Sequence, residues 1–382
     1  MKVSGDWLTH AGTQGLCAAL ESAGYRAFFV GGCVRNALLG EPVADVDLAT
    51  DASPENVTNI AENAGFKVVP TGFDHGTVTV IAAGKPHEVT TFRRDVETDG
   101  RRAVVAFSTD IAEDAARRDF TMNALYADRQ GTLIDPLNGL VDLQARHVRF
   151  VGDPETRIRE DYLRILRFFR FHACYGDPAQ GLDAEALAAC AAFSAGLETI
   201  SKERIGAEMR KLLSAPDPAP AVASMAAAGV LAQILPGADP RALAPLVHLE
   251  GDTPPRWLRR LAVMGGEDPE TALRLSRPES RDLATLRDAI GSLHTPAALG
   301  WQLGADLGLD AILARAATLG TPPPEGWQAD VTRGAGAAFP VTAADLMPAL
   351  QGPALGQRLK ALEAKWLASN LTLSREDLLK GA

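Results

Sequence analysis

Two aspartates and a glycine pair upstream of them are the residues whose types and spacing best suit a chemical reaction. Asp45 and Asp47 alternate in VADVDLAT, which predicts a strand, so both carboxylates are expected on one face. Ahead of them, RAFFVGG predicts a strand that ends in a glycine turn and opens onto the helix CVRNALLG. Backbone N–H groups at such a turn can approach phosphate oxygens closely.

Carboxylates beside a triphosphate suit Mg²⁺, which prefers oxygen ligands and bridges protein to phosphate. The pattern predicts two-metal nucleotidyl transfer, in which one ion lowers the pKa of an attacking hydroxyl and the other stabilises the leaving pyrophosphate. Arg35 lies one turn into the helix, where its cation can meet the same phosphates. Each part has a plainer interpretation, since Gly-Gly is most often a tight turn and an isolated Asp-x-Asp pair a solvated strand end. Their order along the chain favours the catalytic interpretation.

A second motif is ARRDFTMNAL, residues 116–125. Taken alone, it is typical of a charged helix N-terminus with Asp119 as the cap. In a nucleotide site, Arg118 would instead clamp a phosphate and Asn123 would contact the sugar or the backbone.

A third motif is REDYLRILRFFRF, residues 159–171, whose apolar spacing predicts a helix. On that helix Asp161 and Arg164 are three residues apart and therefore adjacent, and Arg167 and Arg170 continue the ridge. A solvated ion pair is the plainer interpretation. The intervening leucine, isoleucine and phenylalanine residues leave little polar surface, which favours a ridge that lines a cleft between domains.

A carboxylate beside a guanidinium also has the pattern needed to choose a base. Cytosine and adenine each offer an amino donor next to a ring-nitrogen acceptor, so one Asp–Arg pair satisfies both. Guanine and uracil offer the reverse order and would leave buried groups unpaired, at ~1–3 kcal/mol each. The pair Asp161 and Arg164 is therefore expected to select C and A and to exclude G and U.

The elements that must position these residues change type along the chain. Residues 26–92 read as alternating strands and helices, with Ser53 as the N-cap of SPENVTNIAENAG and a hairpin that turns at AAGKP. Residues 93–110 carry charge and glycine without periodicity and predict a long mobile loop. From about residue 141 the apolar spacing becomes helical, and the Pro/Ala segment 214–221 is the best domain boundary. The expected architecture is an α/β head, an all-α middle and an all-α tail.

Composition limits the possible classes of protein. A chain of 382 residues is too long for one ordinary core. Its composition, with 46% hydrophobic and 23% charged residues, excludes a disordered or collagenous polymer. No apolar run approaches the ~18 residues of a membrane span, and the N-terminus lacks the apolar region of a signal peptide, so no membrane partner is expected. Cys17, Cys33, Cys174 and Cys190 show no CxxC or Cys/His spacing, which predicts neither a disulfide framework nor a zinc site. The expected compartment is reducing cytosol.

The net charge of −10, from 38 basic and 48 acidic residues, would by itself argue against nucleic-acid binding. The basic groups are, however, concentrated, because residues 146–170 hold seven arginines against four acids. Arginine presents a rigid fork of donors that suits phosphates and base edges. Global charge therefore decides little about RNA binding here.

Together these motifs resemble the class II tRNA nucleotidyltransferases, the CCA-adding enzymes of the polymerase-β-like superfamily. GGCVRNALLGEPVADVDLAT resembles the family's metal and triphosphate motif, RRDFTMNAL its ribose motif, and EDYLR its amino-acid template for the incoming base. ISKERIGAEMRKLL resembles the helical motif that follows, and IDPLNGLVDLQARHVRFVGDP the junction of head and neck. The resemblance covers about residues 26–213, and the tail carries no matching motif.

The resemblance implies an α+β multidomain fold. A polymerase-β-like nucleotidyltransferase head with a mixed sheet would span residues 1–140, a helical neck that recognises the base would span 141–215, and a helical body and tail that binds tRNA would span 216–382. The implied activity is template-independent addition of CCA to the 3′ end of tRNA from CTP and ATP, in the cytoplasm, with the 3′ end and acceptor arm of tRNA as partner.

The resemblance also assigns roles to single residues. Asn36 stands where the family usually has aspartate, a difference that affects a local salt bridge and not catalysis. Glu88 is a weaker candidate for a third catalytic carboxylate. The implied site consists of Mg²⁺ ligands Asp45 and Asp47, triphosphate contacts Gly32 and Arg35, and nucleotide contacts Arg118, Asp161, Arg164, Arg167 and Arg170.

Other classes remain open, among them the bacterial poly(A) polymerases and the partial tRNA nucleotidyltransferases that add only CC or only A. Bacterial poly(A) polymerases share the head but typically carry a GRRF-like segment where this chain reads TGFDHGTVTVI. CC-adding enzymes lack the flexible loop that permits the switch to adenine, whereas this chain retains it as TTFRRDVETDGRRAVVAFSTD. No His-Asp dipeptide occurs, so an HD phosphohydrolase activity is not expected. A small-molecule nucleotidyltransferase would not require the neck or a helical tail of this size. A non-catalytic RNA-binding module would be expected to have lost Asp45, Asp47 or Arg118.

Overall fold

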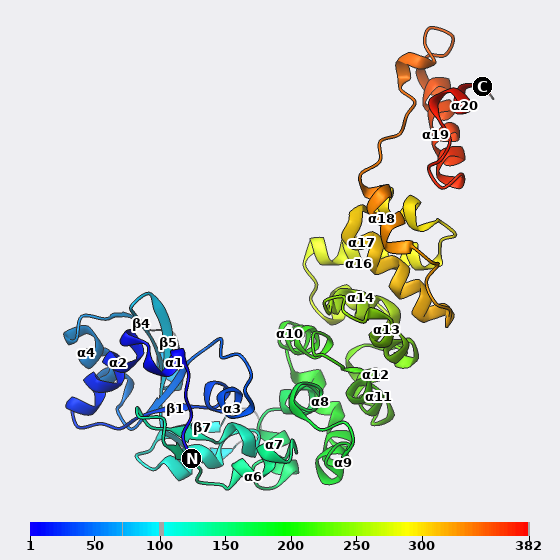
Figure 1. The fold of residues 1–382 in the computed structure, drawn as a ribbon. Coiled ribbons are helices and arrows are strands. Elements are labelled where there is room, and N and C mark those ends of the chain that lie inside the picture. Colours follow the sequence, from blue (N-terminus) through cyan, green and yellow to red (C-terminus); the bar gives the residue numbers. More distant parts are fainter. Residues whose placement is uncertain (71, 99–102, 381–382) are drawn as a thin grey trace. The chain divides into compact units, whose positions relative to one another are not determined.

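The computed structural model describes residues 1–70, 72–98 and 103–380, and the chain forms two compact units, Met1–Ile200 and Ser201–Ala382 (Figure 1). The strands are β1 Ala27–Val30, β2 Asp47–Thr50, β3 Lys67–Val69, β4 Thr77–Ala82, β5 Lys85–Thr91, β6 Arg93–Thr98, β7 Ala103–Phe107, β8 Tyr126–Ala127 and β9 Leu133–Ile134. The helices of the first unit are α1 Asp6–Thr9, α2 Ala11–Ser22, α3 Gly32–Leu39, α4 Pro54–Asn63, α5 Ile111–Ala116, α6 Gly139–Gln144, α7 Pro154–Glu160, α8 Leu163–Tyr175 and α9 Ala184–Ala192. Those of the second unit are α10 Lys202–Leu213, α11 Ala219–Ala227, α12 Val230–Ile234, α13 Leu243–Glu250, α14 Trp257–Met264, α15 Pro269–Ala272, α16 Arg277–Gly291, α17 Pro296–Leu319, α18 Trp327–Ala335, α19 Gly352–Ala368 and α20 Arg375–Lys380.

The first unit is built on a seven-stranded mixed sheet in the order β3-β4-β5-β2-β1-β8-β9. β2 and β5 are parallel and the other neighbours are antiparallel. Helices α2 and α4 pack against each other and against β4. The mixed sheet with helices, followed by an all-helical second unit, confirms the expected α+β fold class.

The strand, glycine turn and helix predicted from RAFFVGG and CVRNALLG are present as β1 and α3. Gly31 has φ 69°, a conformation that side chains with a Cβ rarely adopt, and it turns the chain directly from β1 into α3. Gly40 ends the helix in the left-handed conformation. The hydroxyl of Ser53 accepts the N–H of Asn56 at the start of α4, as the capping pattern predicted.

The second strand is shorter than the sequence predicted, because β2 begins at Asp47 and not near residue 43. β1 pairs with β2 no further than Phe29 opposite Leu48, and the turn at Gly31 then takes the chain out of the sheet. The residues before Asp47 therefore have no partner on that side. The expectation that Asp45 and Asp47 alternate along one strand is wrong, and Asp45 lies in the exposed segment that precedes it.

The segment predicted as an irregular loop, residues 93–110, contains the antiparallel hairpin of β6 and β7. The pairing runs from Arg93 opposite Phe107 to Thr98 opposite Ala103, with a bulge between Asp95 and Glu97. The prediction of irregular structure was wrong because backbone pairing in a two-stranded ribbon does not require the period-two apolar alternation of a strand with one buried face. Residues 99–102, which belong to the same expectation, lie outside the described residues.

The predicted helix over residues 159–171 is interrupted. α7 ends at Glu160, Asp161 is extended with φ −154° and ψ 103°, and α8 begins at Leu163. The carboxylate of Asp161 accepts the N–H of Leu163 at 3.1 Å, and its carbonyl accepts the N–H of Arg164 at 2.9 Å. Aspartate is a good cap and a poor helix interior, so it begins the second helix at the cost of continuity with the first.

The second unit is helical and contains a cluster of buried charges. Arg259 and Arg260 are 0% and 1% exposed and both bind the buried carboxylate of Glu250, while Arg259 also binds Asp310 at 2.7 Å. Arg260 donates to the carbonyl oxygen of Leu213, at the end of α10. Such pairs fix the packing of helices more than they add stability, because each charge is costly to bury alone.

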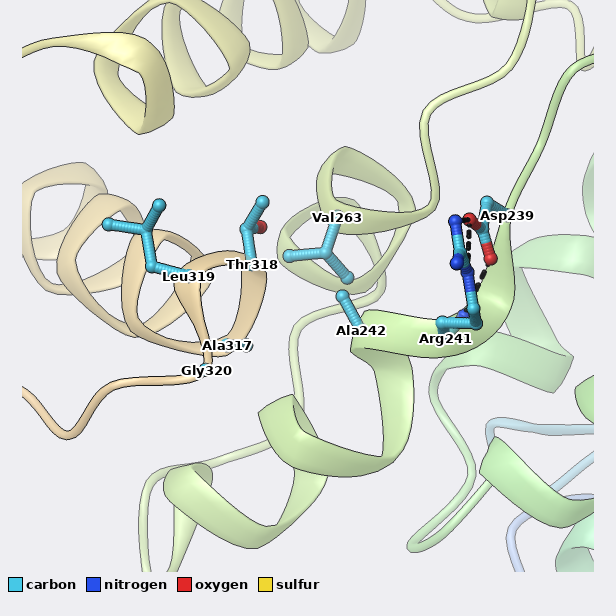
Figure 2. Close-up of a pocket in the computed structure, with 8 residues that line it drawn as sticks. All are labelled: Asp239, Arg241, Ala242, Val263, Ala317, Thr318, Leu319 and Gly320. Atoms are coloured by element: carbon cyan, nitrogen blue, oxygen red, sulfur yellow. Dashed lines mark hydrogen bonds and ion pairs between the residues drawn. The ribbon is translucent and has the colours of Figure 1, made fainter.

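The second unit contains a cavity of about 490 Å³. Figure 2 shows the residues that line it. Its charged lining residues, Asp239 and Arg241, pair with each other at 2.6 Å. Val263, Ala317 and Leu319 contribute apolar surface.

Among residues 1–70, 72–98 and 103–380, the structure holds no apolar helix of the length that spans a bilayer.

The division into two units does not test the three-part organisation expected from the sequence. The Pro/Ala segment 214–221 lies inside the second unit and contains the start of α11. The boundaries 1–140, 141–215 and 216–382 therefore stay a prediction.

Candidate active site

Two carboxylates meet at the edge where β2 begins. Asp47 pairs in parallel register with Glu88 of β5, so the two side chains leave the sheet next to each other. Burial raises the pKa of Asp47 to about 6, the negative charges of Glu88 and Asp45 act in the same direction, and Arg118 opposes them. Like charges gathered in this way favour a bound cation.

The donor set fits Mg²⁺ in one specific form. Within the part of the chain that the structure describes, no group of three or more His, Cys, Asp or Glu side chains converges on one point. Mg²⁺ is commonly held by one or two carboxylates together with water and substrate phosphates. Asp47 with Asp45 or Glu88 would supply the protein ligands of such a site, and a triphosphate would supply the rest.

The glycine turn lies directly beside Arg118. A Cβ placed on Gly31 would be 3.5 Å from Nη1 of Arg118 and 3.8 Å from the carbonyl oxygen of Asn123. A residue other than glycine at this position would therefore narrow the space in front of the guanidinium, in addition to straining the backbone. Gly32, the predicted triphosphate contact, follows as the first residue of α3.

The remaining edge of Arg118 is held by protein groups. Its Nε donates to the hydroxyl of Tyr126 at 3.0 Å, and its Nη2 donates to Oδ2 of Asp114 at 3.1 Å. Burial disfavours the charged form, but Tyr126 and Asp114 outweigh it and raise the pKa of Arg118. The guanidinium is thus a fixed cation with Nη1 next to the turn.

Four of the predicted nucleotide contacts line one cavity of about 300 Å³, together with four further polar residues. Nearly all of its lining is charged, which suits a polar and anionic ligand. The predicted residues are Arg118, Asp161, Arg164 and Arg167, and the further ones are Arg93, Asp114, Arg117 and Asp119.

Asp161 and Arg164 share this cavity, although they do not form the helical ridge that the sequence predicted. Nη1 of Arg164 donates to the carboxylate of Glu160 and, at 2.8 Å, to the carbonyl oxygen of Arg157. Its Nη2 donates to the carbonyl oxygen of Arg117 at 3.2 Å. The break before α8 thus places a carboxylate and a guanidinium, each held by backbone contacts, on the wall of the same cavity.

Arg167 is anchored by Asp119, which is buried. Nε of Arg167 donates to Oδ2 of Asp119 at 2.8 Å, and Nη2 donates to the same oxygen. The other carboxylate oxygen accepts the amide of Asn123 at 2.9 Å. Burial works against the charged form, but Arg167 and Asn123 outweigh it and lower the pKa of Asp119. Asp119 precedes a single 3-10 turn, Thr121–Asn123, so it is not the cap of a helix.

Arg35 lies at the other end of this network, 7% exposed. Its guanidinium donates to the side-chain oxygens of Asn36 and Asn123 and, at 2.8 Å, to the hydroxyl of Tyr175, whose ring it covers at 4.0 Å. Asn36 therefore keeps the contact with Arg35 that an aspartate would make, without the charge. Burial lowers the pKa of Arg35, and the positive charge of Arg170 adds to this.

Arg170 faces the same region, with its guanidinium 4.6 Å from the ring centroid of Phe171. Arg35 and Arg167 also lie over that ring, at 5.1 and 5.3 Å. The structure therefore gathers Arg35 and Arg170 around an aromatic ring on α8. Their contact with phosphate or nucleotide stays a prediction.

The sequence reasoning missed Asp114, Tyr126 and the pairing of Asp119 with Arg167. The spacing of Asp114 four residues before Arg118 is typical of an ion pair on a helix and was an available signal. Tyr126 and Arg167 are joined to their partners by tertiary contacts, for which a single sequence carries no local signal.

Comparisons with known proteins bear on this site. The sequence matches the family model described as "Poly A polymerase head domain" over residues 27–149 and the one described as "Probable RNA and SrmB- binding site of polymerase A" over residues 181–241. The CCA tRNA nucleotidyltransferase 1, mitochondrial, of Mus musculus is 43% identical over 204 residues, which are 53% of this chain and 47% of that protein. The CCA-adding enzyme of Streptococcus pyogenes serotype M4 is 40% identical over 266 residues, 67% of this chain and 64% of that protein. The chain spans about half the length of most of the curated relatives it matches.

Solved structures extend the likeness to almost the whole chain. The CCA-adding enzyme of Thermotoga maritima, complexed with tRNA, has a TM-score of 0.68 over 96% of this chain and 93% of that chain, and at 18% identity it supports the fold alone. The crystal structure of the Bacillus stearothermophilus CCA-adding enzyme in complex with CTP has a TM-score of 0.73 and 31% identity, over 94% of this chain and 92% of that chain. Because that identity extends over nearly the full length of both proteins, the chain belongs to the family of CCA-adding enzymes.

Proposed function

We propose that the chain adds CCA to the 3′ end of tRNA without a nucleic-acid template, using CTP and ATP. The observation that carries this proposal is that Arg118 lies beside the glycine turn, acts by its charge on Asp47, and also lines the cavity with Asp161 and Arg164. One cation thus joins a carboxylate site suited to phosphoryl chemistry with a charged pocket of about 300 Å³. The relatives named for this activity support the proposal.

The chain's own residues would act mainly by binding and positioning. Arg118 would hold the triphosphate against the backbone of Gly31 and Gly32, where the helix N-terminus also favours an anion. Asp161 would accept from the amino group of cytosine or adenine, and Arg164 would donate to the adjacent ring nitrogen. Arg167, held by Asp119, would position the nucleotide without reading its base. Arg35 and Arg170 would add positive charge behind the phosphates.

Asp45 and Asp47 would hold Mg²⁺, with Glu88 as a further candidate. Bound at these carboxylates, Mg²⁺ would supply the charge that lowers the pKa of the attacking 3′-hydroxyl and stabilises the pyrophosphate as it leaves. These carboxylates suit a cation because the raised pKa of Asp47 shows that its negative charge is unfavourable without a positive charge nearby.

The proposed compartment is the cytoplasm, where a reducing environment would keep Cys17, Cys33, Cys174 and Cys190 as the free thiols seen in the structure.

The decisive test is one incubation of the purified chain with a tRNA that lacks CCA and with each labelled nucleotide, with products sized on a gel. Extension by exactly two C residues and one A supports the proposal. A ladder of many A residues would instead identify a poly(A) polymerase, and arrest after two C residues a CC-adding enzyme. Transfer to small hydroxyl acceptors but not to tRNA would identify a small-molecule nucleotidyltransferase.

Affinity for tRNA is expected to fall steeply with salt, despite the net charge of −10. Contacts between arginine and phosphate release counterions, so the logarithm of the association constant should fall linearly with the logarithm of the salt concentration. With about five such contacts, affinity should fall by two to three orders of magnitude between 50 and 200 mM KCl. Fluorescence anisotropy with labelled tRNA measures this, and a flat dependence would favour the small-molecule alternative.

Shortening the hairpin of β6 and β7 is expected to spare the two C additions and to impair the terminal A. One pocket must accept a pyrimidine and then a purine, so an element beside it has to move, and Arg93 at the base of the hairpin lines the cavity. Deleting Glu97–Thr98 with Ala103–Val104 removes paired positions from both strands and keeps the remaining pairing in register. Products that end in CC support the prediction, whereas equal loss of C and A addition shows that the hairpin has only a structural role.

A further inference from the structure

We propose that Asp114 and Tyr126 are positioning residues that hold Arg118 toward the glycine turn, and that Asp114 couples this orientation to the base of the β6–β7 hairpin. The inference rests on the proposed function, because it takes Arg118 to be the residue that meets the nucleotide's phosphates.

Tyr126 is a rigid anchor for the guanidinium. It is 0% exposed on β8 and lies in register with Val30, the last residue of β1 before the glycine turn. Its hydroxyl donates to Oδ2 of Asp114 at 2.8 Å and accepts from Nε of Arg118 at 3.0 Å. The sheet that places the turn therefore also places the group that orients Arg118.

Asp114 completes the hold on Arg118. Its carboxylate is buried, with 4% of the residue exposed, and Oδ2 accepts from Nη2 of Arg118 as well as from Tyr126. These contacts occupy Nε and Nη2, and the position nearest Gly31 is left to Nη1. Because Nε and Nη2 are already held, the Arg118 side chain loses little conformational freedom when a ligand binds at Nη1. This lowers the entropic cost of binding and so favours it.

The second oxygen of Asp114 leads to the hairpin. Oδ1 accepts the backbone N–H of Arg93, the first residue of β6, at 3.3 Å. The side chain of Arg93 lines the same cavity as Arg118 and donates to the carbonyl oxygen of His75 at 2.9 Å. One buried carboxylate thus joins the hairpin's base to the proposed phosphate clamp, so a displacement of that base moves the group that orients Arg118.

Two conservative variants separate these roles. Tyr126→Phe removes one hydroxyl and leaves the ring, and Asp114→Asn keeps the shape of the side chain but removes its charge. The acceptor is tRNA that lacks CCA for CTP and tRNA that ends in CC for ATP. With these acceptors Tyr126→Phe is expected to raise KM for CTP and ATP alike by about tenfold, the effect of losing one hydrogen bond to a charged group, with kcat changed less than about threefold. Asp114→Asn is expected to raise both KM values further and to impair ATP addition more than CTP addition, because the carboxylate of Asp114 accepts the backbone N–H of Arg93 at the base of the hairpin.

The background of Arg118→Ala distinguishes positioning from general stability. If Tyr126 acts through Arg118, adding Tyr126→Phe to Arg118→Ala should change KM by no more than about twofold. Tyr25→Phe is the matched control, since the Tyr25 hydroxyl accepts from Asn56 at 2.9 Å outside the site and its loss should leave KM unchanged. Thermal melts of every variant identify any loss of folded protein.

Additive losses in the Arg118→Ala background, or an unchanged KM in a stably folded Tyr126→Phe, would overturn the positioning role. Equal loss of CTP and ATP use in Asp114→Asn would overturn the coupling to the hairpin. If the wild-type chain extends no tRNA, the proposed function fails, and equilibrium dialysis with labelled CTP decides the positioning role instead. The same tenfold weakening in Tyr126→Phe would then support it, and unaltered affinity would reject it.

Discussion

Replacement of Asp47 by asparagine is expected to abolish nucleotide addition while leaving the fold at least as stable as in the wild type. An amide is a poor substitute for a carboxylate on Mg²⁺, so incorporation of both CMP and AMP should fall by about a hundredfold or more. This loss should not distinguish between the two nucleotides, because the metal acts on phosphates and on the attacking hydroxyl rather than on the base.

Stability should move in the opposite direction. Burial, aided by Glu88, raises the pKa of Asp47 to about 6 in the folded chain, whereas an aspartate in an unfolded chain titrates near 3.9. The folded state therefore binds the proton more tightly, so the contribution of Asp47 to stability is present below about pH 4 and is lost as the pH rises to about 6. At pH 7 Asp47→Asn should raise the free energy of unfolding by roughly 1 to 3 kcal/mol.

Asp51→Asn is the matched control, directly after the last residue of the same strand. The carboxylate of Asp51 accepts the backbone N–H of Arg26 at 2.7 Å and its Nε at 2.8 Å, and it has no part in the proposed site. This variant should keep activity within about threefold and be slightly less stable than the wild type. Activity within tenfold of wild type in Asp47→Asn would reject the metal assignment.

Magnesium itself provides a second measurement. A ligand that binds only the folded state raises the melting temperature, so Mg²⁺ should stabilise the wild-type chain against heat and have a smaller effect on Asp47→Asn. An equal shift in both proteins would mean that Mg²⁺ binds elsewhere, and the loss of activity in Asp47→Asn would then need another cause.

The elements that the sequence predicted correctly are those with strong local signals. An apolar strand followed by two glycines predicted β1 and α3, and Ser53 followed by proline predicted the start of α4. The extent of β2 was not predictable in the same way, because it depends on where its neighbour β1 leaves the sheet at Gly31. Asp45 and Asp47 were identified correctly as neighbouring acids, but the reason given, alternation along one strand, does not hold.

The site's residue types were more predictable than their contacts. Arg118, Asp161, Arg164 and Arg167 line one cavity, which agrees with their assignment to one ligand. Their partners were not predictable, since the pairing of Arg167 with Asp119 spans 48 residues. Such a contact depends on how α8 packs against the rest of the first unit. A single sequence does not encode it in any local pattern.

Base choice is the second large effect, and the break in the helix at Asp161 changes how it must be tested. Because the carboxylate of Asp161 also caps α8 through the N–H of Leu163, Asp161→Ala should cost about 1 kcal/mol of stability in addition to any effect on catalysis. Asp161→Asn keeps a cap and replaces the carboxylate by an amide, which can donate to the O4 of uracil as well as accept from an amino group. The two variants together separate the loss of the cap from the loss of discrimination.

The expected result is a lower rate for CTP and ATP in both Asp161 variants, with relative incorporation of UTP rising in both and more strongly in Asp161→Asn. A buried hydrogen-bonding mismatch of ~1–3 kcal/mol corresponds to about five- to 150-fold in discrimination. Arg164→Ala should weaken CTP and ATP without helping UTP, because it removes a donor and offers the N3–H of uracil no acceptor. Arg167→Ala should slow all nucleotides alike, since Arg167 is held by Asp119 as a positioning contact.

Single-turnover assays with the four nucleotides separately would measure these rates, with melts at the assay temperature to account for the cap. Arg159→Ala is the control, because Arg159 pairs with Glu155 on the exposed face of α7 and does not line the cavity. Its selectivity should equal that of the wild type. If both Asp161 variants also kept wild-type discrimination against UTP and GTP, Asp161 would be only the cap of α8, and the choice of C and A would have to come from another wall of the cavity.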